Sequence, residues 1–348
     1  VIDAAGRPVT PAFFAGITAT GLSEIGMVYE AVDSRLSGLY TGLIHPEFDV
    51  RPAYNPHSSV VPVTRVEGYG YTLLVASPGD RTIAGQGSLV RLDGGYDSFE
   101  GRTALFINVD GYRGNKLGSS RAAHWMLLES VFEELSTDDD DLTLITPRGK
   151  DALHAARRDG LFIFRANRAS DILQALTFGA LHKLKIVISG AQEAWMVREQ
   201  LAAAGVPVVI NALDNLPGSF DGLGARLDNA ALLKEAGVTV LFTSGETQNA
   251  RKLRQVAGNA VANGFPYPAA IEAMTSLPAE IFGGSPKMIA PGLTADLVIW
   301  SGDPLDVTSA ADHVILAGKP DSMKSRQTQL LKRYLPEDAG LGRAYIAP

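Results

Sequence analysis

From residue 150 onward, the chain alternates apolar strand-like runs with helix-like runs, several of which end in glycine, and this alternation constrains the fold most. The pattern predicts strands at 161–167, 185–190, 206–213 and 238–245, and helices at 150–160, 170–184, 191–205, 225–237 and 247–264. Apolar strands that are each followed by a helix indicate βα units around a parallel sheet with both faces buried.

Earlier apolar runs at 12–20, 71–77 and 103–110 predict further strands of the same sheet. A length of 348 residues is ordinary for one α/β barrel. No GxGxxG turn follows any strand, as a dinucleotide-binding open sheet would require. The sequence therefore favours a TIM-like (β/α)8 barrel over an open doubly wound sheet.

The pattern also predicts where the barrel ends. The barrel should occupy residues 11–283, interrupted at 33–68 by a surface excursion that we expect to form a lid or binding loop. Residues 284–321 contain short apolar runs split by Gly and Asp-Pro turns, which predicts a small β domain. Residues 322–348 should form a C-terminal basic helix and tail.

Composition excludes several classes of function. A net charge of −7 argues against nucleic-acid binding. No apolar run approaches the roughly 18 residues of a membrane span, so we expect a soluble protein. The chain has no cysteine, which excludes disulfides and thiolate sites but leaves both the cytoplasm and the periplasm open. Because the chain begins at Val1 inside a strand-like run, we expect an upstream segment to be missing.

The segment from Pro278 to Leu305, PAEIFGGSPKMIAPGLTADLVIWSGDPL, resembles a signature of the amidohydrolase superfamily, in particular of its imidazolonepropionase-like members. The runs VIDAAGRPVTP, RASDI and EAGVTVLFTSGETQNARKLR occur in the family's order. The resemblance implies a (β/α)8 barrel with a small composite β-sandwich built from both chain ends. Residues 1–10 would supply one strand of that sandwich.

The resemblance also implies a divalent metal at the barrel mouth, yet the metal-ligand positions hold other residues. The two histidines of the family's first strand correspond to Ile17 and Ala19, and the fifth-strand ligand corresponds to Arg165. The sixth-strand histidine falls at Ser189 or the adjacent glycine, and the eighth-strand aspartate falls near Gly245. A zinc-type ion needs three or four N, O or S donors, so we expect no metal and no other cofactor.

Polar residues near the expected mouth suggest a ligand site instead. Arg165, Asn167 and Arg168 end a barrel strand, and Thr20 ends the first strand. A guanidinium there can hold a carboxylate or phosphate by paired hydrogen bonds. Alternatively, Arg165 pairs structurally with Glu246 or Asp214.

Other groups keep a catalytic alternative open. Glu24, Asp214 and Glu246 are weak candidates for acid–base roles without metal. A metal site built from His45 and His57 in the excursion is a further, less favoured alternative.

Two hypotheses about function follow. In the first, the protein is non-catalytic, or binds a small anionic ligand, as a homo-oligomer or as the partner of an active paralogue. In the second, it is a hydrolase of non-peptide or dipeptide C–N bonds with a rearranged or metal-free site. Fold alone does not decide between them.

Overall fold

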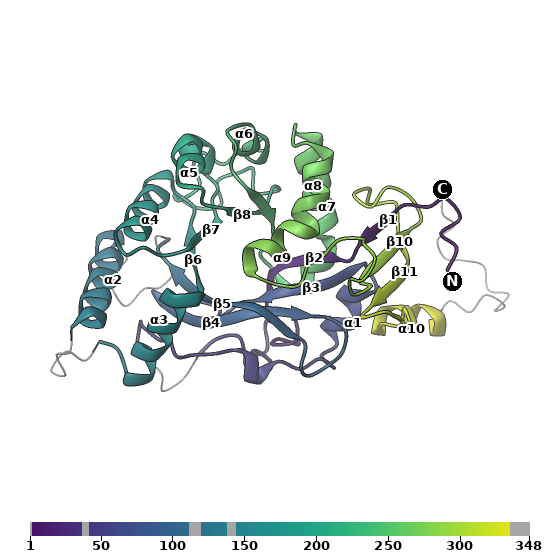
Figure 1. Cartoon of the computed structure of the whole chain (residues 1–348), viewed down its shortest axis with the longest axis horizontal. Helices are drawn as coiled ribbons and strands as arrows, with labels where there is room; N and C mark the ends of the chain where they lie inside the picture. Colours follow the sequence, from purple (N-terminus) through teal and green to yellow (C-terminus); the bar gives the residue numbers. More distant parts are fainter. Residues whose placement is uncertain (1, 37–41, 111–119, 138–143, 335–348) are drawn as a thin grey trace.

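The structure is a computed structural model that describes residues 2–36, 42–110, 120–137 and 144–334. An eight-stranded sheet, in the order β2 to β9, curls into a nearly closed barrel (Figure 1). Its strands are β2 (Phe13–Thr18), β3 (Tyr69–Leu74), β4 (Ile83–Arg91), β5 (Phe99–Asn108), β6 (Leu161–Ala166), β7 (Ile186–Gly190), β8 (Val208–Ile210) and β9 (Val240–Phe242). The TIM-like fold class is thus confirmed.

The barrel sheet is mixed rather than fully parallel, which differs in detail from the expected eight βα units. Strand β4 runs antiparallel to both β3 and β5, whereas the other neighbouring strands in the order β2 to β9 pair in parallel. The connection between β4 and β5 is the glycine-containing segment 92–98. Such a segment is long enough for a hairpin but too short for a parallel crossover.

Alternation along the strands separates two apolar cores. In β6, Leu161 and Ile163 pack inside the barrel, whereas Phe162 and Phe164 pack in the outer core with the helices. Both sets are almost fully buried. Because side chains alternate with a period of two, every residue of such a strand must be apolar until the strand reaches the mouth.

Helices cover the outside of the barrel, and α9 packs against its interior core. The helices are α1 (Val60–Arg65), α2 (Arg121–Ser136), α3 (Pro147–Asp159), α4 (Ala169–Leu181), α5 (Arg198–Ala204), α6 (Asn229–Glu235), α7 (Leu253–Ala262), α8 (Tyr267–Met274), α9 (Ser276–Phe282) and α10 (Arg326–Tyr334). Short 3-10 helices occupy Tyr29–Ala31, Arg51–Ala53, Ala194–Val197 and Thr247–Lys252. Within the described ranges, no helix has the length and apolarity that crossing a bilayer requires.

The described residues of the expected excursion, 33–36 and 42–68, contribute to the barrel wall. Ile44 bridges to Ile83, and Asp49 bridges to Gln86, so the segment runs alongside β4. The Gln86 side chain also donates to the carbonyl of Pro46 at 2.5 Å. This part of the chain runs along the barrel wall and contains α1 (Val60–Arg65), and a lid role for it stays a prediction.

A second, antiparallel sheet joins the two ends of the chain, as the resemblance implies. Its order is β1 (Val9–Pro11), β10 (Leu297–Trp300), β11 (Ala311–Leu316) and β12 (Lys319–Pro320). Helix α10 follows it, and the expected tail from residue 335 onward lies outside the described residues.

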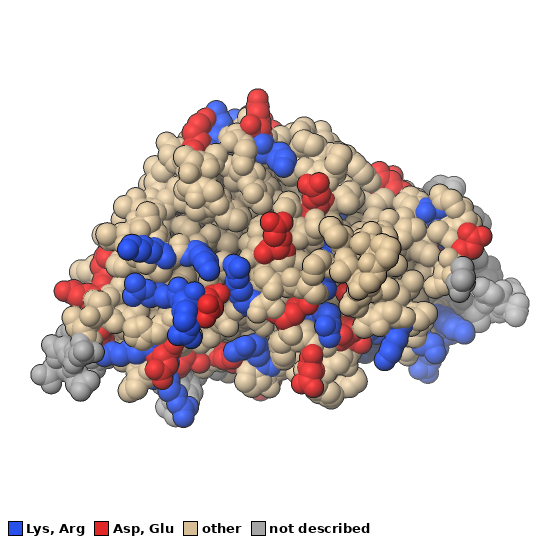
Figure 2. Space-filling view, in the orientation of Figure 1, with Lys and Arg blue, Asp and Glu red and all other residues tan. Residues whose placement is uncertain are grey.

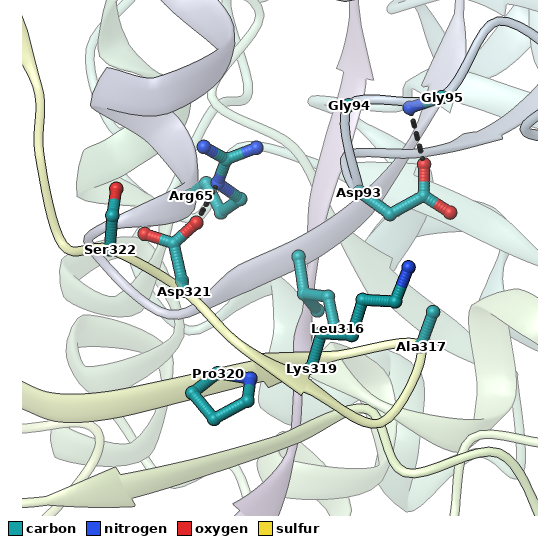
Figure 3. A pocket seen from close by; sticks show the side chains of 10 residues that line it. All are labelled: Arg65, Asp93, Gly94, Gly95, Leu316, Ala317, Lys319, Pro320, Asp321 and Ser322. Atoms are coloured by element: carbon teal, nitrogen blue, oxygen red, sulfur yellow. Dashed lines mark hydrogen bonds and ion pairs between the residues drawn. The ribbon is translucent and has the colours of Figure 1, made fainter.

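A cavity of about 490 Å³ lies where this sheet meets the barrel (Figure 3). Arg65 in α1 forms an ion pair of 2.6 Å with Asp321 across this junction. Asp93 accepts a hydrogen bond of 2.9 Å from the backbone of Gly95. The Arg65–Asp321 pair connects α1 to the segment after β12, whereas Asp93 bonds within its own hairpin. The cavity is lined by two cations and two carboxylates, so it offers no net charge to a ligand.

A buried lysine makes a second connection between the sheets. The Lys287 ammonium lies 3.1 Å from both Glu100 and Asp296, and its side chain is only 2% exposed. Burial opposes ionisation of Glu100, but the hydrogen bond from Ser285 and the Lys287 charge outweigh it and lower the pKa of Glu100 below its usual 4.5.

This lowered pKa predicts a pH-dependent effect of Glu100→Gln. A carboxylate whose pKa is lower in the folded than in the unfolded protein stabilises the fold at pH values above its unfolded-state pKa. This stabilisation is lost as the pH falls through the folded-state pKa. We expect the free energy of unfolding of E100Q to be about 1–2 kcal/mol lower than that of the wild type at pH 7. The difference should nearly vanish once the pH is below the pKa of Glu100 in both the folded and the unfolded protein. Urea denaturation of both proteins between pH 7 and pH 3 measures this, and an equal loss at every pH would contradict it.

Candidate functional site

The carboxyl ends of the parallel strands meet at one end of the barrel, which is the mouth. Strand register pairs Asn108 with Arg165, and Arg165 with Ser189. Since Leu161 and Ile163 point inward, the same alternation directs Arg165 toward the barrel axis. The inward layer at the mouth is therefore polar on these strands, above an apolar interior.

The first-strand positions of the resemblance provide no metal donors. Ile17 and Ala19 are buried, and their side chains belong to the interior core. Their backbone N–H groups instead donate to Thr243 at 3.2 Å and to Thr247 at 2.9 Å. These bonds connect β2 to the segment after β9 and hold the barrel closed at this seam.

Arg165 forms its ion pair with Asp110, not with the Glu246 or Asp214 that the sequence suggested. The guanidinium Nε lies 3.1 Å from one carboxylate oxygen of Asp110. The same carboxylate accepts bonds of 2.8 Å from the backbone and the side-chain amide of Asn167. Asp110 is mostly buried, whereas the Arg165 side chain is 56% exposed. Asp110 thus holds a cation that faces solvent at the mouth.

Asp214 lies near this cation, in the loop after β8. Its carboxylate accepts hydrogen bonds from Asn211 at 2.9 Å and from Gln192 at 3.3 Å. Burial raises the pKa of Asp214, although the Gln192 bond and the charge of Arg165 act in the opposite direction. The structure therefore brings together Arg165, Asn167 and Asp214 from the predicted set.

The remaining candidates have other partners. Glu24 accepts bonds from Ser59 at 2.7 and 3.0 Å; partial burial disfavours its charge, but hydrogen bonds from Ser59 and Ser58 prevail and lower its pKa. Glu246 binds the side chains of Gln248 and Asn249 at the start of the following 3-10 helix. Arg168 precedes α4, where its carbonyl accepts bonds from the first turn.

Thr20, Ser189 and Gly245 complete the predicted positions. Thr20 is fully buried, and its hydroxyl accepts a bond of 2.9 Å from Thr18, so it contributes to packing under the mouth. Ser189 ends β7 beside Arg165. Gly245 adopts a φ of +70° in the turn after β9, a conformation that glycine accommodates best.

The histidines of the excursion have separate environments. His45 lies 3.6 Å from Glu47, and the His57 ring packs against Tyr96. In the described part of the chain, no group of three or more His, Asp or Glu side chains could hold a metal ion.

Asp110 is a site residue that was not among those predicted from the sequence. Asp110 ends the predicted strand 103–110, directly after an apolar run. A charged residue at the carboxyl end of a barrel strand is a recognised signal for a site. That signal was present, but only the strand register shows that Asp110 lies next to Arg165.

Comparison with known proteins supports the fold. No model of a known protein family matches the chain. A curated protein, amidohydrolase TasK of Hapsidospora irregularis, is 32% identical over 90 residues. That match covers 25% of this chain and only 9% of the relative.

Solved structures match over nearly the whole chain. An amidohydrolase from Thermotoga maritima superposes with a TM-score of 0.79 and 21% identity, covering 92% of this chain and 88% of that one. A prolidase complexed with N-methylphosphonate-L-proline gives a TM-score of 0.50 and 14% identity, covering 92% and 88%. The match to the Thermotoga maritima structure therefore shows that this chain has the same fold as that amidohydrolase.

Proposed function

We propose that the protein binds a small anionic ligand, a carboxylate, at its barrel mouth through Arg165. The observation that carries this proposal is the arrangement of Arg165 itself. Its Nε is held by the buried Asp110, while its side chain is 56% exposed. Within the described residues, its two terminal Nη groups make no hydrogen bond or ion pair.

The donor set of the mouth does not fit a divalent metal. Ile17 and Ala19 carry no donor atom, and the Arg165 cation would repel a metal ion. The carboxylates of Asp110 and Asp214 already accept hydrogen bonds from the groups around them. Residues that do not contact a metal ion directly cannot replace metal ligands that are missing.

The same arrangement suits a carboxylate. The two terminal nitrogens of a guanidinium match the two oxygens of a carboxylate, and such paired bonds are among the stronger ones in proteins. Because Asp110, itself bonded to Asn167, holds the guanidinium in place, less side-chain freedom is lost on binding. These features favour capture of an anion over activation of a water molecule.

A second candidate function is metal-free hydrolysis of a C–N bond, which the raised pKa of Asp214 favours. A carboxyl group with a raised pKa can act as a general acid near neutral pH. Such a reaction also needs a base, and Glu24 and Glu246 are engaged with Ser59 and Asn249. The geometry therefore supports binding better than catalysis.

Titration of the protein with N-acetyl-L-proline, followed by calorimetry, tests the proposal. This probe carries one carboxylate on the ring system present in the ligand of the prolidase relative. We expect binding to the wild type and at least a tenfold weaker affinity for Arg165→Gln, because a charged, paired contact is lost. Arg158→Gln is the matched control, since Arg158 is an exposed residue of α3 that pairs with Asp159.

Three results would contradict the proposal: equal affinity of R165Q and wild type, absence of binding, or stoichiometric zinc, manganese or iron at the mouth by elemental analysis. Release of acetate from the probe would instead favour the hydrolase alternative. In that case Asp214→Asn should abolish the release.

A further inference from the structure

A groove opens at the amino-terminal ends of β6, β7 and β8, on the side of the barrel opposite the mouth. Its volume is about 350 Å³, which falls within the range of small-molecule sites. Leu161, Ile186 and Val206 form a buried apolar floor, and the half-buried Ile281 of α9 closes one side. The groove is thus formed by barrel strands and by the helix that packs against the barrel interior.

Two cations, Arg102 of β5 and Lys185 just before β7, line the same groove. In the part of the chain that the structure describes, neither side chain forms an ion pair or a hydrogen bond. The aliphatic stem of Arg102 passes beside Gly283, which keeps the guanidinium at the groove. Glu280 also lines the groove but pairs with neither cation within those residues.

The surrounding surface adds to this positive character. Figure 2 shows Lys and Arg side chains gathered over α3 and the adjoining end of α4. The chain as a whole has a net charge of −7, so the sign of this cluster is opposite to that of the net charge.

An apolar floor beside unpaired cations is complementary to an amphipathic anion. An inorganic anion alone would leave the floor in contact with water, and an apolar molecule alone would leave both cations without a partner. A ligand with an acidic head and a short apolar chain satisfies both, because chain burial and charged hydrogen bonding add to its affinity. The groove is an open depression of about 350 Å³, a volume that a small molecule can fill.

We infer that this groove is a second binding site, distinct from the mouth, for a small amphipathic anion. Arg102 and Lys185 bind its carboxylate or phosphate head, and Leu161, Ile186, Val206 and Ile281 pack against its chain. This site does not depend on the function proposed for Arg165.

Calorimetric titration of the full chain with octanoate and with octyl phosphate tests the inference and distinguishes the two head groups. We expect at least one of them to bind the wild type, and octanol and acetate to bind at least tenfold more weakly. The double variant R102Q/K185Q should lose at least tenfold in affinity, since it lacks the charged contacts to the head. Ile281→Asn, which keeps both cations, should also weaken binding because it disrupts the apolar side of the groove.

Two control variants locate the site. Lys252→Gln removes an exposed cation at the end of the 3-10 helix Thr247–Lys252, outside the groove, and should bind as the wild type does. Arg165→Gln should also bind as the wild type, which separates this groove from the mouth. The inference is overturned if neither probe binds, if R102Q/K185Q binds them equally well, if octanol binds as tightly as both acids, or if R165Q abolishes binding.

Discussion

Replacing Gly87 by alanine is expected to destabilise the protein by about 3 kcal/mol or more. A Cβ atom at Gly87 in β4 would overlap the carbonyl oxygen of Leu74 and would lie 2.9 Å from its carbonyl carbon. Both groups are backbone within the barrel sheet, so no side-chain rotation relieves the contact. Strands β3 and β4 would have to separate, which would break the wall that supports the mouth.

Thermal and urea denaturation of G87A measure this effect. The control is Gly26→Ala, because a Cβ atom there meets nothing within 4 Å and Gly26 has no positive φ. We expect G26A to unfold like the wild type. If G87A also does so, the close approach of β3 and β4 is not a constraint on this fold.

Replacing Arg254 by methionine should cost about 2–4 kcal/mol, because several buried acceptors lose a charged hydrogen-bond donor. Arg254 in α7 is only 6% exposed. Its guanidinium donates to the carbonyls of Pro304 and Ser309, each at 3.0 Å, and lies over the Trp300 ring. Methionine can still pack against Trp300, but it leaves these carbonyls without donors.

The expected result for R254M is a lower urea midpoint and a lower melting temperature, since the chain-end sheet would lose one of its connections to the barrel. Lys252→Gln is the control, because Lys252 is exposed at the end of the preceding 3-10 helix. Arg254→Lys should fall between the two, since one ammonium cannot reach all the guanidinium's acceptors. Wild-type stability of R254M would show that the contacts to 304–309 contribute little.

The sequence predicted the barrel well because its strands are buried on both faces. Runs such as Leu161–Ala166 must be apolar at nearly every position. Their length and spacing therefore indicate the repeating alternation of strands and helices. It predicted β4 less well, because the glycines and the polar residues of 83–91 follow no clear period. Their conformation depends on the neighbouring segment 43–50 and on β3, neither of which is local in the chain.

The candidate site was predicted in part. The sequence correctly placed Arg165 at the end of a strand, since strand ends follow directly from the apolar pattern. It did not identify the partner, because Asp110 lies 55 positions away and meets Arg165 only through the register of β5 and β6. The contacts of Thr20 with Thr18 and of Glu246 with Asn249 were likewise not predictable from the sequence. Thr20 and Glu246 therefore remain candidate site residues only because they lie near the barrel mouth.

By itself, the sequence determined the fold class and the lack of donor atoms at Ile17 and Ala19, because these depend on periodicity and on residue type. The joining of both chain ends in a small sheet was implied by the family resemblance, and the structure confirms it. Only the tertiary structure decided that Asp110 holds Arg165 toward solvent, and that Arg102 and Lys185 line the same apolar groove. Such pairings depend on strand register and packing between distant segments, which local patterns do not encode.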